Sequence, residues 1–177
     1  MAMEKTDTLV IGAGQAGVAM SEHLSKLDIP HIVLERSRIA ERWRTERWDS
    51  LVCNGPAWHD RFPGLAMEAD QDAFVAKDKV AAYFEAYARK FKAPIRTGVE
   101  VTRVTRNQRR PGFTVETSAG VFEANRVVAA TGPFQKPVIP AVAPQAGSQL
   151  QMHSTQYRNP DQLPAGAVLV VGAGSSG

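Results

Sequence analysis

Residues 8–17 read TLVIGAGQAG, a short apolar run that leads into three glycines spaced as G-x-G-x-x-G. The apolar run is typical of a buried parallel strand, and Gln15–Leu27 places apolar residues at helical spacing. Residues 28–30 (DIP) end that helix, and His31–Leu34 predicts a second strand that reaches Glu35. Strand, helix and strand in this short span indicate a βαβ unit with the usual right-handed crossover.

Each glycine of this loop meets a different physical demand. Gly12 permits the tight turn after the strand, Gly14 lets the backbone approach a pyrophosphate, and Gly17 allows close packing of helix on strand. The helix N-terminus supplies amide donors and the positive end of the helix dipole. Glu35 lies at the end of the second strand, where a carboxylate accepts hydrogen bonds from an adenosine ribose. Together these features favour a dinucleotide site over a structural glycine turn.

The last residues of the chain repeat this pattern. Val168–Val171 is an apolar run that predicts a buried strand, and Gly172, Gly174 and Gly177 repeat the spacing of the first three glycines. Two such loops suggest two dinucleotides, a bound flavin and a diffusing nicotinamide, although a chance valine-glycine strand end is the alternative. The helix and the ribose selector of the second site would follow Gly177. We therefore expect residues 167–177 to begin a truncated NAD(P)-binding domain.

Composition excludes several classes of function. The 177 residues carry a net charge of +3, from 21 basic and 18 acidic side chains that are mixed along the chain, which disfavours nucleic acid. The one cysteine, Cys53, excludes an intrachain disulfide, and the histidines lack metal-ligand spacing, so we expect no metal. No apolar run approaches the ~20 residues of a membrane span, and the charged N-terminus is not a signal peptide. These features predict a cytoplasmic protein that does not bind membranes.

The rest of the chain divides into an irregular segment (36–76), an amphipathic helix (Lys77–Phe91), a set of strands and a proline-rich connector. The predicted strands comprise a three-stranded antiparallel meander (Val99–Thr105, Gly112–Thr117 and Gly120–Ala124) and a separate strand (Arg126–Ala130).

We therefore predict an α/β fold, a Rossmann-like FAD/NAD(P)-binding domain of the three-layer ββα type with an antiparallel β-meander insertion. The FAD-binding domain is expected to span residues 1–145, and an interdomain connector residues 146–166.

These motifs together resemble the flavin-containing monooxygenases and their plant branch, the YUCCA-type indole-3-pyruvate monooxygenases, over essentially the whole chain. Residues 39–43 (IAERW) resemble the segment that wraps the flavin, and residues 128–132 (VAATG) are similar to the A-T-G element that returns the chain to the FAD domain. Residues 153–157 (HSTQY) look like the second half of the F-x-G-x-x-x-H-x-x-x-F/Y signature. The first half is missing, which favours the YUCCA-like form.

The resemblance implies that FAD is reduced by NADPH and reacts with O2 to form a flavin C4a-hydroperoxide. This species would transfer one oxygen atom to a small organic substrate and release the other as water. The resemblance and the glycine loops together imply FAD contacts at Gly12, Gly14, Gln15, Ala16, Gly17, Glu35, Arg36, Arg42, Trp43, Val101, Ala130, Thr131 and Gly132. The NADP contacts would be made by Gly172, Gly174 and Gly177.

Several polar and aromatic residues have two interpretations. Residues 50–54 (SLVCN) resemble the stretch before a flavin-site asparagine, so Asn54 is the candidate catalytic residue, but an Asn-Gly turn explains it equally well. Trp43 and Trp58 are interpreted as packing residues, with contact to the isoalloxazine as the alternative. We interpret His153 as a structural link between domains rather than as a base.

Two other functions remain open. A flavin disulfide reductase of the glutathione-reductase type needs a cysteine pair that this chain lacks, whereas a thioredoxin-reductase-like pair would lie past Gly177. The second alternative is a flavin-binding fragment without turnover. We expect the chain alone to bind FAD weakly or not at all and not to oxidise NADPH.

We also expect Val168–Val171 to join the sheet of another copy as a homo-oligomer contact, to fold back, or to be disordered.

Overall fold

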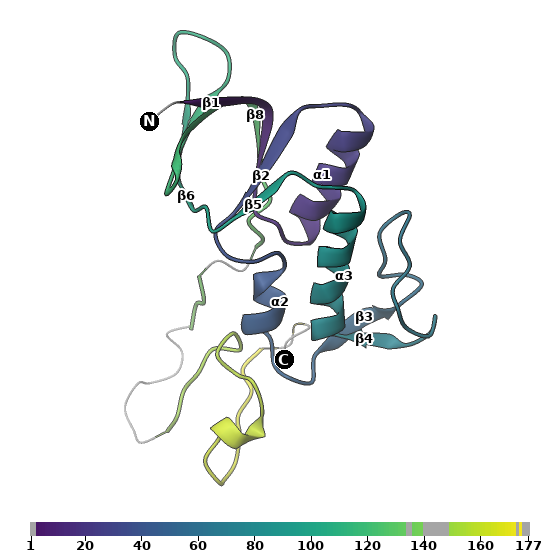
Figure 1. Cartoon of the computed structure of the whole chain (residues 1–177). Coiled ribbons are helices and arrows are strands. Elements are labelled where there is room, and N and C mark those ends of the chain that lie inside the picture. Colours follow the sequence, from purple (N-terminus) through teal and green to yellow (C-terminus); the bar gives the residue numbers. More distant parts are fainter. Residues whose placement is uncertain (1–2, 134–135, 140–148, 173, 175–177) are drawn as a thin grey trace.

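The computed structural model describes residues 3–133, 136–139, 149–172 and 174 (Figure 1). The elements in chain order are β1 (Glu4–Ile11), α1 (Gln15–Lys26), β2 (His31–Glu35), α2 (Glu41–Thr45), β3 (Val52–Pro56), β4 (Phe74–Ala76), α3 (Lys77–Lys90), β5 (Ile95–Thr97), β6 (Val101–Arg106), β7 (Phe113–Thr117), β8 (Gly120–Ala129) and the short 3-10 helix η1 (Pro160–Gln162).

One sheet with the strand order β5-β2-β1-β8-β7-β6 organises the fold. The first four of these strands pair in parallel, and the last three pair in antiparallel fashion as a meander. β1 is followed in sequence by β2 on one side, and β8 lies on its other side, so the strand order reverses at the end of β1. The predicted α/β fold with its βαβ unit and meander is confirmed.

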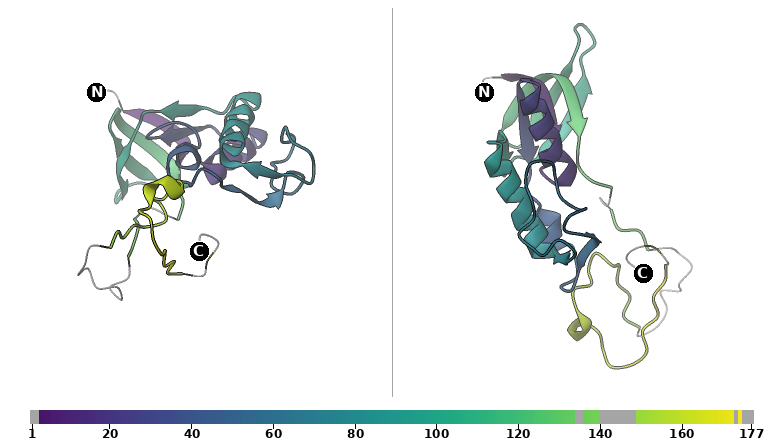
Figure 2. Two further views of the ribbon diagram at one scale, coloured as in Figure 1. Left: turned by 90° about the horizontal axis from the view of Figure 1, so that it is seen from below. Right: turned by 90° about the vertical axis from the view of Figure 1, so that its right-hand side faces the viewer.

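Apolar side chains cover both faces of the sheet, and this produces the three layers. β1 shows the alternation directly, because Leu9 and Val10 are both fully buried but belong to two different cores. Val10 packs with the residues of α1 and α3, which lie together on one face (Figure 2). Leu9 packs on the other face with Val115 and Phe122 from the meander. The meander thus forms the layer opposite the helices.

β8 differs from the prediction. The sequence predicts a strand that ends at Ala124 and a new strand from Arg126, but the structure has one continuous ten-residue strand. In the sequence, the polar residues Asn125 and Arg126 interrupt the apolar run and suggest a break between two strands. In the structure, both side chains contact Asp7 of the neighbouring strand β1. The Asn125 amide donates to the Asp7 carboxylate at 3.1 Å, and Arg126 forms an ion pair with it. This cross-strand partner lets the strand continue from β7 to β1.

The segment that the sequence predicts to be irregular, 36–76, contains the short elements α2, β3 and β4. Two tyrosines of α3 attach its remaining loop to the helix. The Tyr83 hydroxyl accepts the Phe62 N–H at 2.7 Å and donates to the Leu65 carbonyl at 2.7 Å. The Tyr87 hydroxyl donates to the carbonyl of Pro63 at 3.1 Å. The predicted helix of residues 77–91 is therefore present as α3, and it also organises the loop before it.

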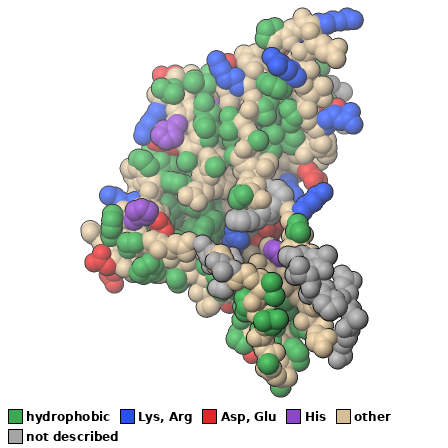
Figure 3. Space-filling model, turned by 180° about the vertical axis from the view of Figure 1, so that it is seen from behind, with side chains coloured by type: hydrophobic (Ala, Val, Ile, Leu, Met, Phe, Trp, Pro, Cys, Tyr) green, Lys and Arg blue, Asp and Glu red, His purple; other side chains and the backbone are tan. Residues whose placement is uncertain are grey.

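The predicted strand at Val168–Val171 is wrong. These four residues adopt no regular structure and their side chains are 61–87% exposed. A strand requires a neighbour for its backbone hydrogen bonds, and no described strand lies beside this run. Apolar side chains are visible on the surface of the lower lobe of the molecule in Figure 3.

Among the described residues, no helix has the length and apolarity needed to cross a membrane.

Replacing Tyr83 with Phe tests how strongly the loop is attached to α3. The change keeps the ring but leaves the Phe62 N–H and the Leu65 carbonyl without their partner, which should lower the free energy of unfolding by about 1–3 kcal/mol. Urea denaturation measures this loss. Tyr157→Phe is the matched control, because no hydrogen bond of its hydroxyl occurs in the described part of the chain. Equal stability of both variants would contradict the assigned role.

Candidate functional site

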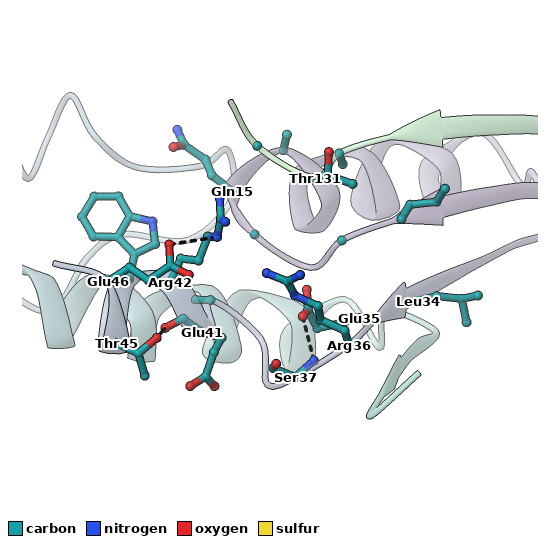
Figure 4. A pocket seen from close by; sticks show the side chains of 18 of the residues that line it. Gln15, Leu34, Glu35, Arg36, Ser37, Glu41, Arg42, Thr45, Glu46 and Thr131 are labelled. Atoms are coloured by element: carbon teal, nitrogen blue, oxygen red, sulfur yellow. Dashed lines mark hydrogen bonds and ion pairs between the residues drawn. The ribbon is translucent and has the colours of Figure 1, made fainter. Parts of the chain in front are cut away.

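A cavity of about 890 Å³ opens at the carboxyl ends of the parallel strands, where the strand order reverses (Figure 4). Ligands of open α/β sheets bind at such points, and the size is that of a cofactor site. Of the residues predicted to contact FAD, those lining this cavity are Gly12, Gly14, Gln15, Ala16, Glu35, Arg36, Arg42, Trp43, Val101, Ala130, Thr131 and Gly132. The remaining one, Gly17, lies behind the loop.

Two of the three loop glycines are required by the protein itself. Gly12 has φ +103°, and a Cβ there would lie 2.6 Å from the carbonyl oxygen of Ala130. A Cβ on Gly17 would lie 1.8 Å from the carbonyl oxygen of Gly12. No side chain fits at either position, so these glycines bring α1 directly against the end of β1.

Gly14 is different, because nothing in the protein demands a glycine there. It is the N-cap of α1 with φ −81° and ψ −164°, an extended conformation that other residues adopt. A Cβ on Gly14 would have no protein atom within 4 Å and would project into open space. This open cradle lies beside the helix N-terminus, where amide groups without intrahelical partners bind anions. The geometry therefore fits a pyrophosphate group.

Glu35 fixes the loop as well as facing the cavity. One carboxylate oxygen accepts the Ala13 N–H at 2.8 Å, and the other accepts the Ser37 N–H at 2.9 Å (Figure 4). An ionised carboxylate offers about four lone-pair sites, so each oxygen keeps capacity for a further donor. Glu35 thus joins the turn after β1 to the turn after β2 and retains the acceptors that a ribose needs.

The helix α2 forms the wall opposite the glycine loop. Its N-cap, Ala40, has φ +58° and donates its N–H to the Ala13 carbonyl at 3.1 Å, which joins α2 to the loop. The Trp43 ring stands edge-on to Phe84 of α3 at a centroid distance of 6.2 Å. The Arg42 side chain extends from α2 toward the glycine loop and pairs with Glu46 at 3.1 Å (Figure 4).

Charge inside the cavity is mixed but suits a diphosphate. Three arginines, Arg36, Arg42 and Arg47, line it together with acidic residues of α2 and of the strand ends. Guanidinium groups bind phosphate oxygens through paired hydrogen bonds. At the rim, the hydrogen bond from Arg38 lowers the pKa of Glu41 and keeps that carboxylate ionised. Two of the lining acids, Glu41 and Glu46, are thus paired with arginines, and Arg36 and Arg47 also line the cavity where an anionic ligand would lie.

The cavity also includes residues that are not among the individually predicted FAD contacts, although Ala40 and Glu41 belong to the predicted flavin-wrapping segment 39–43. These are Ile11, Leu34, Ser37, Ala40, Glu41, Thr45, Glu46, Arg47, Val99, Glu100 and Pro133. Most of them flank a predicted residue by a few positions, so proximity along the chain was the available signal. Arg47 had none, because it lies beyond the recognised 39–43 segment.

Other predicted residues lie outside the cavity. Asn54 lies in β3 with an exposed side chain, and Trp58 is 53% exposed. His153 contacts the Thr155 hydroxyl at 3.0 Å. Gly172 and Gly174 are exposed and do not line this cavity. Gly177 lies outside the described residues.

Cys53 is a buried thiol with no cysteine partner. Burial, with a smaller effect of the nearby Asp60 carboxylate, raises the pKa of Cys53 to about 11. Because only a thiolate attacks disulfides, this cysteine is poorly suited to redox exchange.

The reactivity of Cys53 toward Ellman's reagent tests this conclusion. At pH 8 the folded chain should react far more slowly than the same chain in urea, because burial blocks access and keeps the thiol protonated. Raising the pH toward 11 should accelerate the folded chain further than it accelerates the unfolded one. Equal rates in buffer and in urea would show that Cys53 is accessible.

The glycine loop, the acid at the end of β2 and the cavity between them define a nucleotide-binding α/β domain. Comparison with known proteins gives its family. Residues 9–177 match the model of the pyridine nucleotide-disulphide oxidoreductases, and the chain belongs to this family.

Individual relatives agree with this assignment. The chain is 45% identical to an "Uncharacterized oxidoreductase CzcO-like" of Geobacillus kaustophilus, over 97% of this chain and 49% of the relative. It is 31% identical to the indole-3-pyruvate monooxygenase YUCCA1 of Oryza sativa, over 96% of this chain and 42% of that protein. The flavin-containing monooxygenase from Stenotrophomonas maltophilia has a similar fold, with a TM-score of 0.80 and 26% identity, over 90% of this chain and 48% of that structure.

The resemblance to flavin monooxygenases that the sequence indicates is therefore confirmed. The chain spans about half the length of the relatives that it matches.

Proposed function

We propose that this chain forms the FAD-binding part of a flavin-dependent, NADPH-using monooxygenase. The observation that carries the proposal is the open cradle at Gly14, beside the N-terminus of α1 and within the same cavity as Glu35. A glycine that the protein does not need, at a site where a Cβ would fill ligand space, is best explained by a bound pyrophosphate. The similarity to flavin monooxygenases supports FAD as the dinucleotide.

The residues of the cavity divide into two groups under this proposal. The glycine loop would hold the pyrophosphate, and Glu35 would accept hydrogen bonds from the adenosine ribose, with Arg36 and Val101 beside it. At the other end, Trp43 would border the flavin ring. The segment Ala130–Gly132, which starts against Gly12, would lie beside the pyrophosphate. Bound FAD supplies the electron transfer and the oxygen chemistry, whereas these residues bind it, orient it and exclude water.

NADPH would deliver two electrons, and O2 would supply one oxygen atom to the substrate and one to water. The substrate would be a small organic molecule, and amines, sulfides, ketones and 2-oxo acids all suit this chemistry. A disulfide reductase is the competing function. The buried Cys53 with its raised pKa does not supply the thiol chemistry of a glutathione-reductase-type enzyme, whereas a thioredoxin-reductase-like pair past Gly177 stays the alternative.

The source of the oxygen atom distinguishes these functions. The native protein should lose its visible flavin absorbance when NADPH is added without O2, and regain it when O2 is admitted. With a methyl sulfide as the probe and isotopically labelled O2, mass spectrometry should find one labelled oxygen atom in the sulfoxide. Flavin reduction without label in any product, together with reduction of an added disulfide, would establish a reductase instead.

Gly14→Val tests the pyrophosphate site. The valine side chain would fill the cradle, so ADP binding by the 177-residue chain should fall below detection in calorimetry. Stability should change by no more than about 1 kcal/mol, because the site is an extended N-cap.

Gly17→Ala is the matched comparison at the neighbouring glycine. Its new Cβ would collide with the Gly12 carbonyl, which should cost about 3 kcal/mol or more of stability. Normal ADP affinity in Gly14→Val would remove the assignment.

Glu35→Ala tests the ribose contact, but it also removes the hydrogen bonds that hold the loop. Comparing ADP with deoxy-ADP, which lacks one ribose hydroxyl, separates the two effects. The wild-type chain should prefer ADP by about 1–3 kcal/mol, the scale of hydrogen bonds to a charged group. In Glu35→Ala this preference should disappear. A preference that survives the substitution would show that Glu35 acts only on the loop.

A further inference from the structure

The segment 153–163 precedes the second glycine loop in the sequence, and it contacts α2, the helix that forms one wall of the cavity. It carries η1 and lies below α2 in Figure 1. The Asp49 N–H, a few residues after α2, donates to the Arg158 carbonyl at 2.7 Å. The Asn159 side-chain amide donates to the Asp49 carboxylate at 2.7 Å. These contacts bridge more than 100 residues of sequence.

Arg158 makes the contact that reaches the cavity wall. Its guanidinium donates to the carbonyl of Thr45, the last residue of α2. The same group donates to the carbonyls of Thr155 and Tyr157 at 2.8 Å each. One side chain therefore holds its own segment in a turn and attaches that turn to α2.

The attached segment is ordered by its own hydrogen bonds, so it can act as a fixed support. Asn159 caps η1 by accepting the Asp161 N–H at 3.1 Å, and the Gln162 side chain accepts from the backbone at Asn159 in a capping box. The Gln162 amide also donates to the Gln156 carbonyl at 3.2 Å.

The wall itself needs such support. α2 has only five residues, and a helix this short does not persist without tertiary contacts. Its start is bonded to the glycine loop and its middle pairs with α3 through Arg44 and Glu85 at 2.7 Å. Its last carbonyls have no partner within the helix, and a cation is favourable there. Arg158 supplies that cation at Thr45, which itself lines the cavity.

We infer that Arg158 is a positioning residue for the cofactor site: it fixes the C-terminal end of α2 and couples the connector to dinucleotide binding. This inference rests on the proposed function. Thr45 and Glu46 lie at the end of the cavity away from Leu34 (Figure 4). Loss of Arg158 should therefore disturb the part of FAD beyond the ADP moiety, and leave the part held by Glu35 and the glycine loop unchanged.

The test compares FAD with ADP in the full-length native protein and its variants. Arg158→Ala should weaken FAD binding roughly tenfold, the scale of one charged hydrogen bond, while ADP affinity stays as in the wild type. Arg158→Lys keeps a cationic donor and should recover part of the loss. Arg61→Ala is the matched control, because it also removes an arginine that donates to a loop carbonyl, that of Trp58 at 3.1 Å, but outside the cavity.

Hydrogen exchange gives a second measurement. If Arg158 only stabilised the fold, its loss would not change the effect of FAD on amide exchange in the connector. FAD should slow amide exchange in residues 153–163 of the wild type, since a bound ligand and a docked connector stabilise each other. In Arg158→Ala, FAD should no longer change exchange there. Arg61→Ala should behave like the wild type.

The outcomes separate the two proposals. A full-length native protein that binds neither ADP nor FAD overturns the proposed function, and the inference with it. ADP binding with FAD bound no more tightly overturns the inference alone. Equal losses of FAD and ADP affinity in Arg158→Ala, or FAD protection of residues 153–163 that persists in this variant, also overturn it.

Discussion

The contact on which this structure depends is the approach of two backbones, at Gly17 and Gly12. A Cβ on Gly17 would lie 1.8 Å from the Gly12 carbonyl oxygen, so α1 touches the end of β1 without any intervening side chain. This contact aims the N-terminus of α1 at the cavity. The neighbouring strand ends are held around the same turn, since the Gly12 N–H donates to the Leu34 carbonyl at 2.8 Å and the Ala130 N–H to the Ile11 carbonyl at 2.9 Å.

Glu35 turns this packing into a prepared site. Its carboxylate joins the turn after β1 to the turn after β2 through the N–H groups of Ala13 and Ser37. The acceptor atoms are thus oriented before any ligand arrives, which reduces the ordering cost of binding. The same hydrogen bonds explain why an acid here has a structural role as well as a binding one. The two roles are carried by different lone pairs of one group.

Whether a feature could be predicted from the sequence depended on how far along the chain its partner residues lie. The glycine loop and Glu35 were predictable because both belong to one βαβ unit, in which the strand ends lie side by side. The continuity of β8 was not, because Asn125 and Arg126 depend on Asp7, more than 100 residues away. The exposed run Val168–Val171 was misjudged for the same reason, since apolar composition indicates a strand only where a neighbour supplies the hydrogen bonds. Local demands were therefore visible in the sequence, whereas cross-chain partners were not.

This difference divides the cavity into two ends of unlike construction. The loop end is specified by backbone geometry that only a few residues can satisfy, so it can hold the same nucleotide moiety in proteins of different chemistry. The α2 end is held by three separate contacts: a backbone hydrogen bond to the glycine loop, an ion pair with α3 and a hydrogen bond from Arg158 of the connector. A fold built this way can continue to bind a dinucleotide while the position of α2 changes. α2 borders the part of the cavity where a monooxygenase and a disulfide reductase would differ.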